Sequence, residues 1–166
     1  MLTLPASASD VLAQVIVPAL ATLPQAMDSP EARLLLLAIG AQESGYRARQ
    51  QVGGPARGFW QFEINGVLAV MHNTRTAGLM FDWCRENDIT YGSHSIYDQL
   101  DQDDELACVP ARLMLWADPR PLPKIGDVQG AFDYYERGWM PGKPNYSRWR
   151  DTAYPQALAA IQRAAA

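Results

Sequence analysis

Apolar residues are densest between residues 32 and 41, where the sequence reads ARLLLLAIGA. Just before this segment, Asp28 or Ser29 can cap a helix and Pro30 suits its first turn, so a helix is expected to begin here. Gly45 is typical of a position where a helix ends. Because apolar residues cover nearly every side of this helix, we expect it to be the central buried helix of the fold.

A single carboxylate, Glu43, stands at the end of this apolar segment, and a polar loop over residues 46–57 follows it. Burial disfavours the charged form of a carboxyl group, so it raises the pKa and keeps the proton bound at neutral pH. This position makes Glu43 a candidate catalytic acid. The alternative is a structural glutamate paired with Arg47 or Arg49.

The rest of the pattern predicts a mainly α chain of the α+β kind, with one small β or irregular segment near residues 58–64. Asn65-Gly66 is typical of a turn, and residues 118–123 contain three prolines that forbid a helix interior. We expect a single domain over residues 1–166, with an N-terminal helix within residues 1–28 packing on it. The other expected helices cover approximately residues 10–23, 74 or 76–86, 95–100, 105–116, 127–138 and 151–163.

Length and charge narrow the class of protein. A chain of 166 residues suits one domain with a sizeable core. The net charge of −4, from 14 basic and 18 acidic residues, argues against a dedicated nucleic-acid binder, which usually has a basic patch and a high isoelectric point. We therefore expect no nucleic acid among its partners.

The cysteines and histidines show no metal-binding pattern. Cys84 and Cys108 stand in segments expected to be helical, which favours two buried free thiols over a disulfide. His72 and His94 lack the HExxH spacing of a zinc site. We expect neither a metal nor a cofactor.

The N-terminal sequence MLTLPASASDVLAQVIVPALATLP has no Lys or Arg, and Asp10, Gln14 and Pro18 interrupt its apolar residues. It is therefore not expected to be a secretory signal peptide. No uninterrupted apolar run reaches the roughly 18 residues that a membrane-spanning helix needs, so no membrane span is expected.

Three motifs occur in a fixed order: Gln42-Glu43-Ser44, then GPARGFWQ over residues 54–61, then YYERG over residues 134–138. Gly58 follows Glu43 by 15 positions, and an Ala-rich segment begins at Ala107. This ordered set resembles the lytic transglycosylases and goose-type lysozymes, in which Q-E-S, G-x-x-G-L-M-Q and A-Y-N-x-G follow one another. The resemblance covers residues 31–140, roughly two-thirds of the chain.

The resemblance implies a lysozyme-like fold and an enzyme that cuts peptidoglycan glycan strands between N-acetylmuramic acid and N-acetylglucosamine. Glycosidic cleavage requires an acid that protonates the leaving oxygen while an oxocarbenium-like centre develops. In a transglycosylase, one carboxyl group serves first as acid and then as base toward the sugar's own 6-hydroxyl, which gives a 1,6-anhydro product. The resemblance assigns this role to Glu43.

Five further residues acquire expected roles from the same resemblance. Ser44 either orients the carboxylate or helps to end the helix, and Gln61 is expected to hydrogen-bond the N-acetyl groups of the substrate. Phe59 and Trp60 stand where the family has Leu-Met, and we expect at most one of them to line a sugar groove, since aromatic residues are more often core. Tyr135 matches the family tyrosine that lies near the acid.

Two residues depart from the family pattern. Glu136 replaces the family's asparagine, and Glu63 lies just past Gln61, near where goose-type enzymes have an extra acid. Either can hold a water molecule and change the reaction from anhydro formation to lysozyme-type hydrolysis. The alternative is that both are solvated surface acids.

Late in the chain an aromatic and basic cluster admits two interpretations. Its aromatic residues suit either a groove wall or a lid on the core, and its basic residues suit either peptide-stem carboxylates or a solvated face. The cluster comprises Trp116, Trp139, Tyr146 and Trp149 with Lys143, Arg148 and Arg150.

Three hypotheses about function follow. The first is a phage-encoded enzyme of the virion or of host lysis, located in the virion or in the host cytoplasm with delivery to the periplasm. Its partners are then peptidoglycan strands and other virion proteins. The second is a non-catalytic phage structural or assembly protein that retains the fold. The third is a helical interaction domain with coincidental motifs, which predicts no cleft at Glu43.

Overall fold

The computed structural model describes all residues, 1–166, and the chain is mainly helical with no regular strand, which confirms the expected mainly α class. The elements in chain order are α1 (Ala8–Val11), a π-helical turn (Leu12–Ile16), α2 (Val17–Ala21), a 3-10 turn (Gln25–Met27), α3 (Pro30–Glu43), α4 (Ile64–His72), α5 (Ala77–Glu86), α6 (Ser93–Tyr97), α7 (Asp104–Ala117), α8 (Val128–Trp139), α9 (Tyr146–Arg148), a second π-helical turn (Trp149–Ala153) and α10 (Tyr154–Ala164).

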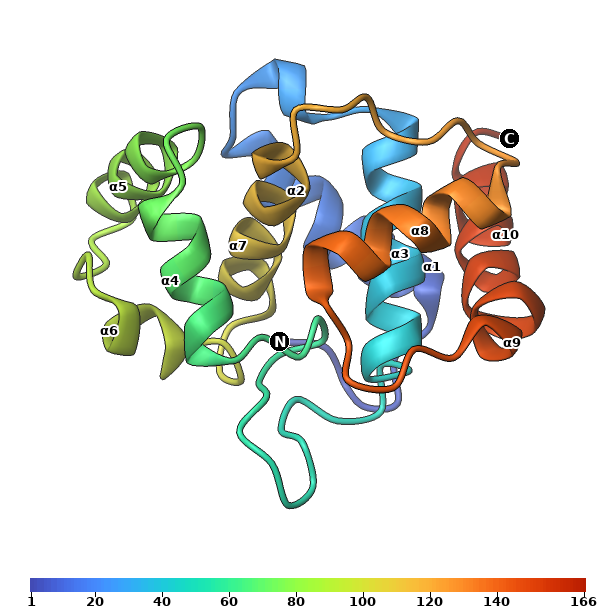
Figure 1. Cartoon of the computed structure of the whole chain (residues 1–166), viewed down its shortest axis with the longest axis horizontal. Helices are drawn as coiled ribbons and strands as arrows, with labels where there is room; N and C mark the ends of the chain where they lie inside the picture. Colours follow the sequence, from blue (N-terminus) through green and yellow to red (C-terminus); the bar gives the residue numbers. More distant parts are fainter.

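Helix α3 lies at the centre of the molecule, as its apolar sequence predicts. Ser29 caps it, with its Oγ accepting a hydrogen bond from the backbone N of Ala32 at 3.1 Å, and Pro30 occupies the first turn. Every residue from Leu34 to Gln42 is buried. In Figure 1, α7 lies on one side of α3 and α10 on the other, while α8 crosses α3 at a steep angle.

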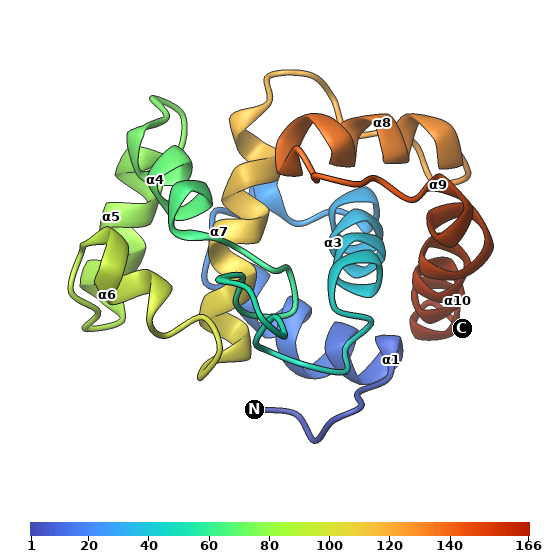
Figure 2. The same ribbon diagram turned by 60° about the horizontal axis from the view of Figure 1, so that its bottom comes forward.

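Helices α4, α5 and α6 form a second group beyond α7. Helix α4 packs against α5, α6 and α7, so α7 stands between this group and α3 in both views (Figures 1 and 2). The hydrophobic core nevertheless runs through both groups, from Val11 near the N-terminus to Ala160 in α10. Both cysteines lie in this core as free thiols.

The segment between α3 and α4 is irregular. Only isolated antiparallel bridges, from Arg57 to Gln50 and from Arg57 to Phe62, occur where a short strand was one of the expected alternatives. The turn expected at Asn65-Gly66 is wrong, because both residues lie in the first turn of α4. Burial of Val67 and Val70 on one face of α4 outweighs the local turn preference.

Both terminal helices begin earlier than the sequence suggests. The N-terminal helix starts after Ser7, whose Oγ accepts from the backbone N of Asp10, rather than near residue 10. The C-terminal helix begins at Tyr146 rather than near residue 151, because the Asn145 side chain caps it through the backbone N of Arg148. It continues through a π-helical turn before Pro155.

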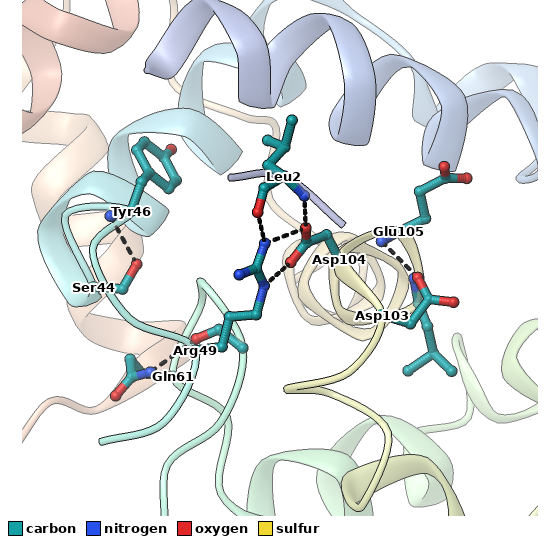
Figure 3. A network of polar contacts seen from close by, with 10 residues as sticks. Leu2, Ser44, Tyr46, Arg49, Gln61, Asp103, Asp104 and Glu105 are labelled. Atoms are coloured by element: carbon teal, nitrogen blue, oxygen red, sulfur yellow. Dashed lines mark hydrogen bonds and ion pairs between the residues drawn. The ribbon is translucent and has the colours of Figure 1, made fainter. Parts of the chain in front are cut away.

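A buried ion pair anchors the irregular segment and the N-terminus to α7 (Figure 3). Arg49 binds Asp104 through two hydrogen bonds, Nε to Oδ1 at 2.6 Å and Nη2 to Oδ2 at 2.7 Å. The backbone of Leu2 completes the cluster: its N donates to Asp104 Oδ2 at 2.9 Å and its O accepts from Arg49 Nη2 at 2.7 Å. Such a fork-to-fork geometry holds three distant segments in one register.

Gly40 provides a test of how closely α3 is packed. A Cβ atom at this position would lie 2.6 Å from Cε1 of Tyr46, whose hydroxyl donates to Leu37 O at 2.5 Å and whose ring is buried. We expect Gly40→Ala to lower the free energy of unfolding by about 1–3 kcal/mol, although alanine by itself favours a helix by about 1 kcal/mol.

The matched control is Gly78→Ala in α5, where an added Cβ meets nothing within 4 Å. This control should be neutral or stabilising in the same urea titration. If Gly40→Ala were as stable as the control, the Tyr46 ring would not be held against α3 as the structure has it.

Candidate functional site

Glu43 is the last residue of α3 and is partly buried. After it the backbone turns sharply, with left-handed φ values of 59° at Gly45 and 55° at Tyr46. A carboxyl group at this position also meets the negative end of the helix dipole, which disfavours its ionisation. The helix end thus presents one acid at the margin of the core.

Tyr135 of α8 contacts this acid directly. Its hydroxyl donates a hydrogen bond to Oε1 of Glu43 at 2.6 Å, across 92 positions of sequence. The tyrosine ring is buried and stacks on Trp149 with ring centroids 5.2 Å apart and an interplanar angle of 12°. The expected proximity of Tyr135 and Glu43 is therefore present in the fold.

Burial raises the pKa of Glu43, while the hydrogen bond from Tyr135 and the positive charge of Arg148 act in the opposite direction. Burial and the Glu43 charge in turn raise the pKa of Tyr135, so its hydroxyl keeps its proton and acts as a donor. Arg49 pairs with Asp104 rather than with Glu43, and no ion pair joins Glu43 to Arg47. The alternative of a structural glutamate paired with Arg47 or Arg49 is therefore wrong.

Arg148 is the cation whose charge lowers the pKa of Glu43. Its Nη2 donates to the carbonyl O of Ala41 at 2.8 Å, at the C-terminal end of α3. The sequence marked Arg148 only as part of a basic cluster. Its place beside the acid depends on the early start of the C-terminal helix, which the sequence did not predict.

Ser44 belongs to the end of the helix rather than to the acid. Its Oγ donates to Gly40 O at 3.1 Å. It also accepts from the backbone N of Tyr46 at 3.1 Å (Figure 3). It makes no hydrogen bond to Glu43. Of the two roles open for Ser44, the structure supports helix termination.

Gln61 has a left-handed backbone (φ 49°) and is partly buried. Its Nε2 donates to Gly58 O at 2.8 Å, which fixes the side chain within its own loop. The Oε1 atom makes no hydrogen bond within the chain.

Phe59 and Trp60 are both core residues, with relative exposures of 0% and 1%. Trp60 Nε1 donates to Leu36 O at 2.9 Å, and Phe59 packs edge-on against Tyr46 with centroids 5.3 Å apart. Assigning either residue to substrate binding is wrong, because both rings seal the irregular segment onto α3.

Trp139 is one of the aromatic residues of the late cluster that the structure leaves partly exposed. It lies one turn beyond Tyr135 on α8, with ring centroids 6.4 Å apart, and its Nε1 donates to Trp60 O at 3.0 Å. In the late aromatic cluster, Trp149 is instead fully buried. The cluster therefore divides between a core lid at Trp149 and a partly exposed surface at Trp139.

The two additional acids lie in different surroundings. Glu63 is exposed at the start of α4. Glu136 is partly buried beside Tyr135, and its charge contributes to the raised pKa of that tyrosine. Neither carboxyl group hydrogen-bonds to Glu43.

One hollow of the molecule lies away from Glu43. It has a volume of about 410 Å³ and is lined from the first turn of α3, the end of α7 and the loop that follows α7. No group of three or more His, Cys, Asp and Glu side chains is arranged to hold a metal ion. None of the helices combines the length and the apolar character needed to cross a lipid bilayer.

The chain matches no known protein-family model, no curated protein sequence and no solved structure. The resemblance to lytic transglycosylases therefore rests on the sequence motifs alone. Of the motif residues, Glu43 and Tyr135 are brought together, while Phe59 and Trp60 are withdrawn into the core. Ser44 ends α3, and Gln61 is bonded within its own loop.

The raised pKa of Glu43 predicts a pH-dependent stability difference for Glu43→Gln. The amide oxygen can still accept from Tyr135, whereas the wild-type carboxyl must ionise in a desolvated place. At neutral pH, we expect the free energy of unfolding of the variant to equal that of the wild type or to exceed it by up to about 1 kcal/mol.

The direction of this difference follows because the pKa of Glu43 is higher in the folded chain than in the unfolded chain. The wild type loses stability as pH rises from the ordinary carboxyl range through the folded pKa, so the gap to the variant should open over that window and be absent below it. Urea unfolding at several pH values measures this gap, with Glu63→Gln as an exposed control. A variant that is much less stable at neutral pH would show that the carboxylate is stabilised in the fold.

Proposed function

We propose that this chain is a phage-encoded, peptidoglycan-cleaving enzyme that cuts the bond between N-acetylmuramic acid and N-acetylglucosamine with Glu43 as general acid and base. The hydrogen bond from Tyr135 to Glu43 supports this proposal most directly, because it joins the first and last motifs of the resemblance at one carboxyl group. A pKa raised by burial suits an acid that must hold its proton near neutral pH.

The reaction needs one carboxyl group. Protonated Glu43 gives its proton to the glycosidic oxygen, the bond from that oxygen to C1 of the muramic acid breaks, and the leaving sugar keeps the bonding electron pair. The Glu43 carboxylate then takes the proton of the 6-hydroxyl as O6 bonds to C1. A 1,6-anhydro sugar forms, no water is consumed, and Glu43 is again protonated.

The neighbours of Glu43 have matching roles in this proposal. Tyr135 occupies Oε1 as donor and leaves Oε2 to carry the transferred proton. Arg148, through its positive charge, favours the carboxylate that exists between the two proton transfers. Trp139 offers a partly exposed ring for a sugar face, and Gln61 offers its Oε1 to an N-acetyl N–H.

Lysozyme-type hydrolysis is the second candidate mechanism. Glu136 is the acid that supports it, because it is partly buried and its charge acts on the same tyrosine that binds Glu43. In that mechanism Glu136 activates a water molecule that attacks C1, and the product is a reducing end.

Glu43→Gln should lower the rate of dye release from labelled, purified peptidoglycan by about 100-fold or more, because loss of a general acid typically has an effect of this size. Circular dichroism should show an unchanged fold. Glu86→Gln, which removes an exposed acid in α5, is the matched control and should retain full activity. Full activity of Glu43→Gln would overturn the proposal, and inactivity of the wild type on walls of several chemotypes would favour the structural or assembly alternative.

Tyr135→Phe should shift the pH profile of the same assay. The hydroxyl lowers the pKa of Glu43, so its removal raises that pKa and keeps the acid protonated to higher pH. The high-pH limb of activity should therefore move upward, by up to about one pH unit.

Tyr134→Phe controls for general damage to α8, because the Tyr134 hydroxyl donates to Leu115 O instead of to the acid. This variant should lose stability without moving the pH limb. If Tyr135→Phe lowered activity equally at every pH, Tyr135 would act only through packing.

A further inference from the structure

Arg112, in the middle of α7, is a buried charge without a partner. Its relative exposure is 2%, and only its Nε is bonded, to Met27 O at 2.7 Å. Its Nη1 is sealed from solvent and has no hydrogen-bond partner, and no acid lies within ion-pair distance of the guanidinium. Buried arginines are rare unless paired, since an unpaired buried charge is strongly unfavourable.

The Arg112 side chain lines the hollow of about 410 Å³. This volume lies within the roughly 300–1,000 Å³ range of small-molecule sites. One wall is the loop between α7 and α8, which passes over the N-terminal end of α3 in Figure 1. Since Nε is bonded and Nη1 is sealed from solvent, Nη2 is the donor that Arg112 offers to this space, which is large enough for a small organic ligand.

Other cations surround the same space. Arg75, Arg120 and Lys124 line the hollow together with Arg112. The guanidinium groups of Arg75 and Arg112 lie 5.7 and 5.3 Å from the ring centroid of Trp116, so the indole helps to hold both.

Two acids also line the hollow, and they do not cancel this charge. Asp118 is engaged by Arg120 at 2.6 Å and, from outside the hollow, by Arg137 at 3.7 Å. Glu31, in the first turn of α3, is the other acid. Four cations against two acids leave a local excess of positive charge on a chain whose net charge is −4.

We propose that this hollow binds a small molecule bearing an oxyanion, either a phosphate or a carboxylate, with Arg112 as the buried ligand and Arg75 and Lys124 as its exposed partners. The free Nη2 of Arg112 carries two N–H donors and a share of the guanidinium charge, which suit the oxygens of such groups. The acid whose charge acts on Arg112 is Asp28, which forms its ion pair with Arg33 instead, so a bound anion would give Arg112 a counter-charge of its own. The site is separate from Glu43, because Tyr134 and Tyr135 of α8 face the hollow and the acid respectively.

Titration of the intact chain with inorganic phosphate and, separately, with citrate tests the proposal. The ¹H–¹⁵N signal of Arg112 Nε should shift in a saturable way, and one of the two anions should bind more tightly and so identify the preferred group. Chloride at matched ionic strength should not reproduce the shift, because it screens charge without accepting the paired donors.

Variants separate a built site from general charge attraction. Arg75→Gln and Lys124→Gln, both exposed, should keep the fold and weaken binding by about three- to tenfold each. Arg112→Lys keeps the charge but loses the planar guanidinium group, so it should weaken binding by about tenfold or more. Arg85→Gln, an exposed arginine of α5 outside the hollow, is the matched control and should bind as the wild type does.

Two results would overturn the proposal. The first is the absence of a saturable Arg112 shift with either anion at millimolar concentrations. The second is equal weakening by Arg85→Gln, which would mean unspecific attraction. Glu43→Gln should bind the anion as the wild type does, so the outcome is independent of whether the chain cleaves peptidoglycan.

Discussion

The complete burial of α3 is the constraint on which the rest of the structure depends. Its residues from Leu34 to Gln42 are covered on all sides, chiefly by α7, α10 and the turn before α10. A helix buried in this way can present polar chemistry only at its ends. The last residue, Glu43, is therefore held where desolvation is strong enough to raise its pKa and where one side still reaches solvent.

Helix α8 connects this acid with a second polar region. Because successive residues on a helix point about 100° apart, Tyr134 and Tyr135 serve different neighbours. Tyr135 donates to Glu43, whereas Tyr134 donates to Leu115 O and lines the hollow around Arg112. One short stretch of α8 thus positions the acid and closes the cationic hollow, although these two sites have opposite electrostatic demands.

Signals in the sequence correctly predicted the features that depend on neighbouring residues, such as the ends of a helix. Ser29, Pro30 and Gly45 marked the ends of α3 correctly, because caps and helix-ending glycines act within a few residues. Burial of Phe59 and Trp60 was not predicted for the individual residues, since an irregular segment has no periodicity that separates inside from outside. The Asn65-Gly66 turn failed for a related reason, because burial of the following valines decides the fold there.

Contacts between distant segments could be predicted from the sequence only in part. The motif resemblance anticipated the Tyr135–Glu43 pair, whereas the places of Arg148 and Trp139 depend on how the last helices pack. Arg112 left a signal that went unused: a lone arginine among the apolar residues of ACVPARLMLW, on a helix expected to be amphipathic. Only the fold shows that this arginine has no acidic partner.

The most direct test of the central claim is mass spectrometry of the products released from purified peptidoglycan. A single carboxyl group acting as acid and then base predicts fragments that end in 1,6-anhydro-N-acetylmuramic acid, and predicts that Glu43→Gln releases none. Reducing ends would contradict the single-carboxyl mechanism and implicate a water-activating residue such as Glu136. The absence of any fragments from the wild-type protein would contradict the claim that this chain cleaves the cell wall.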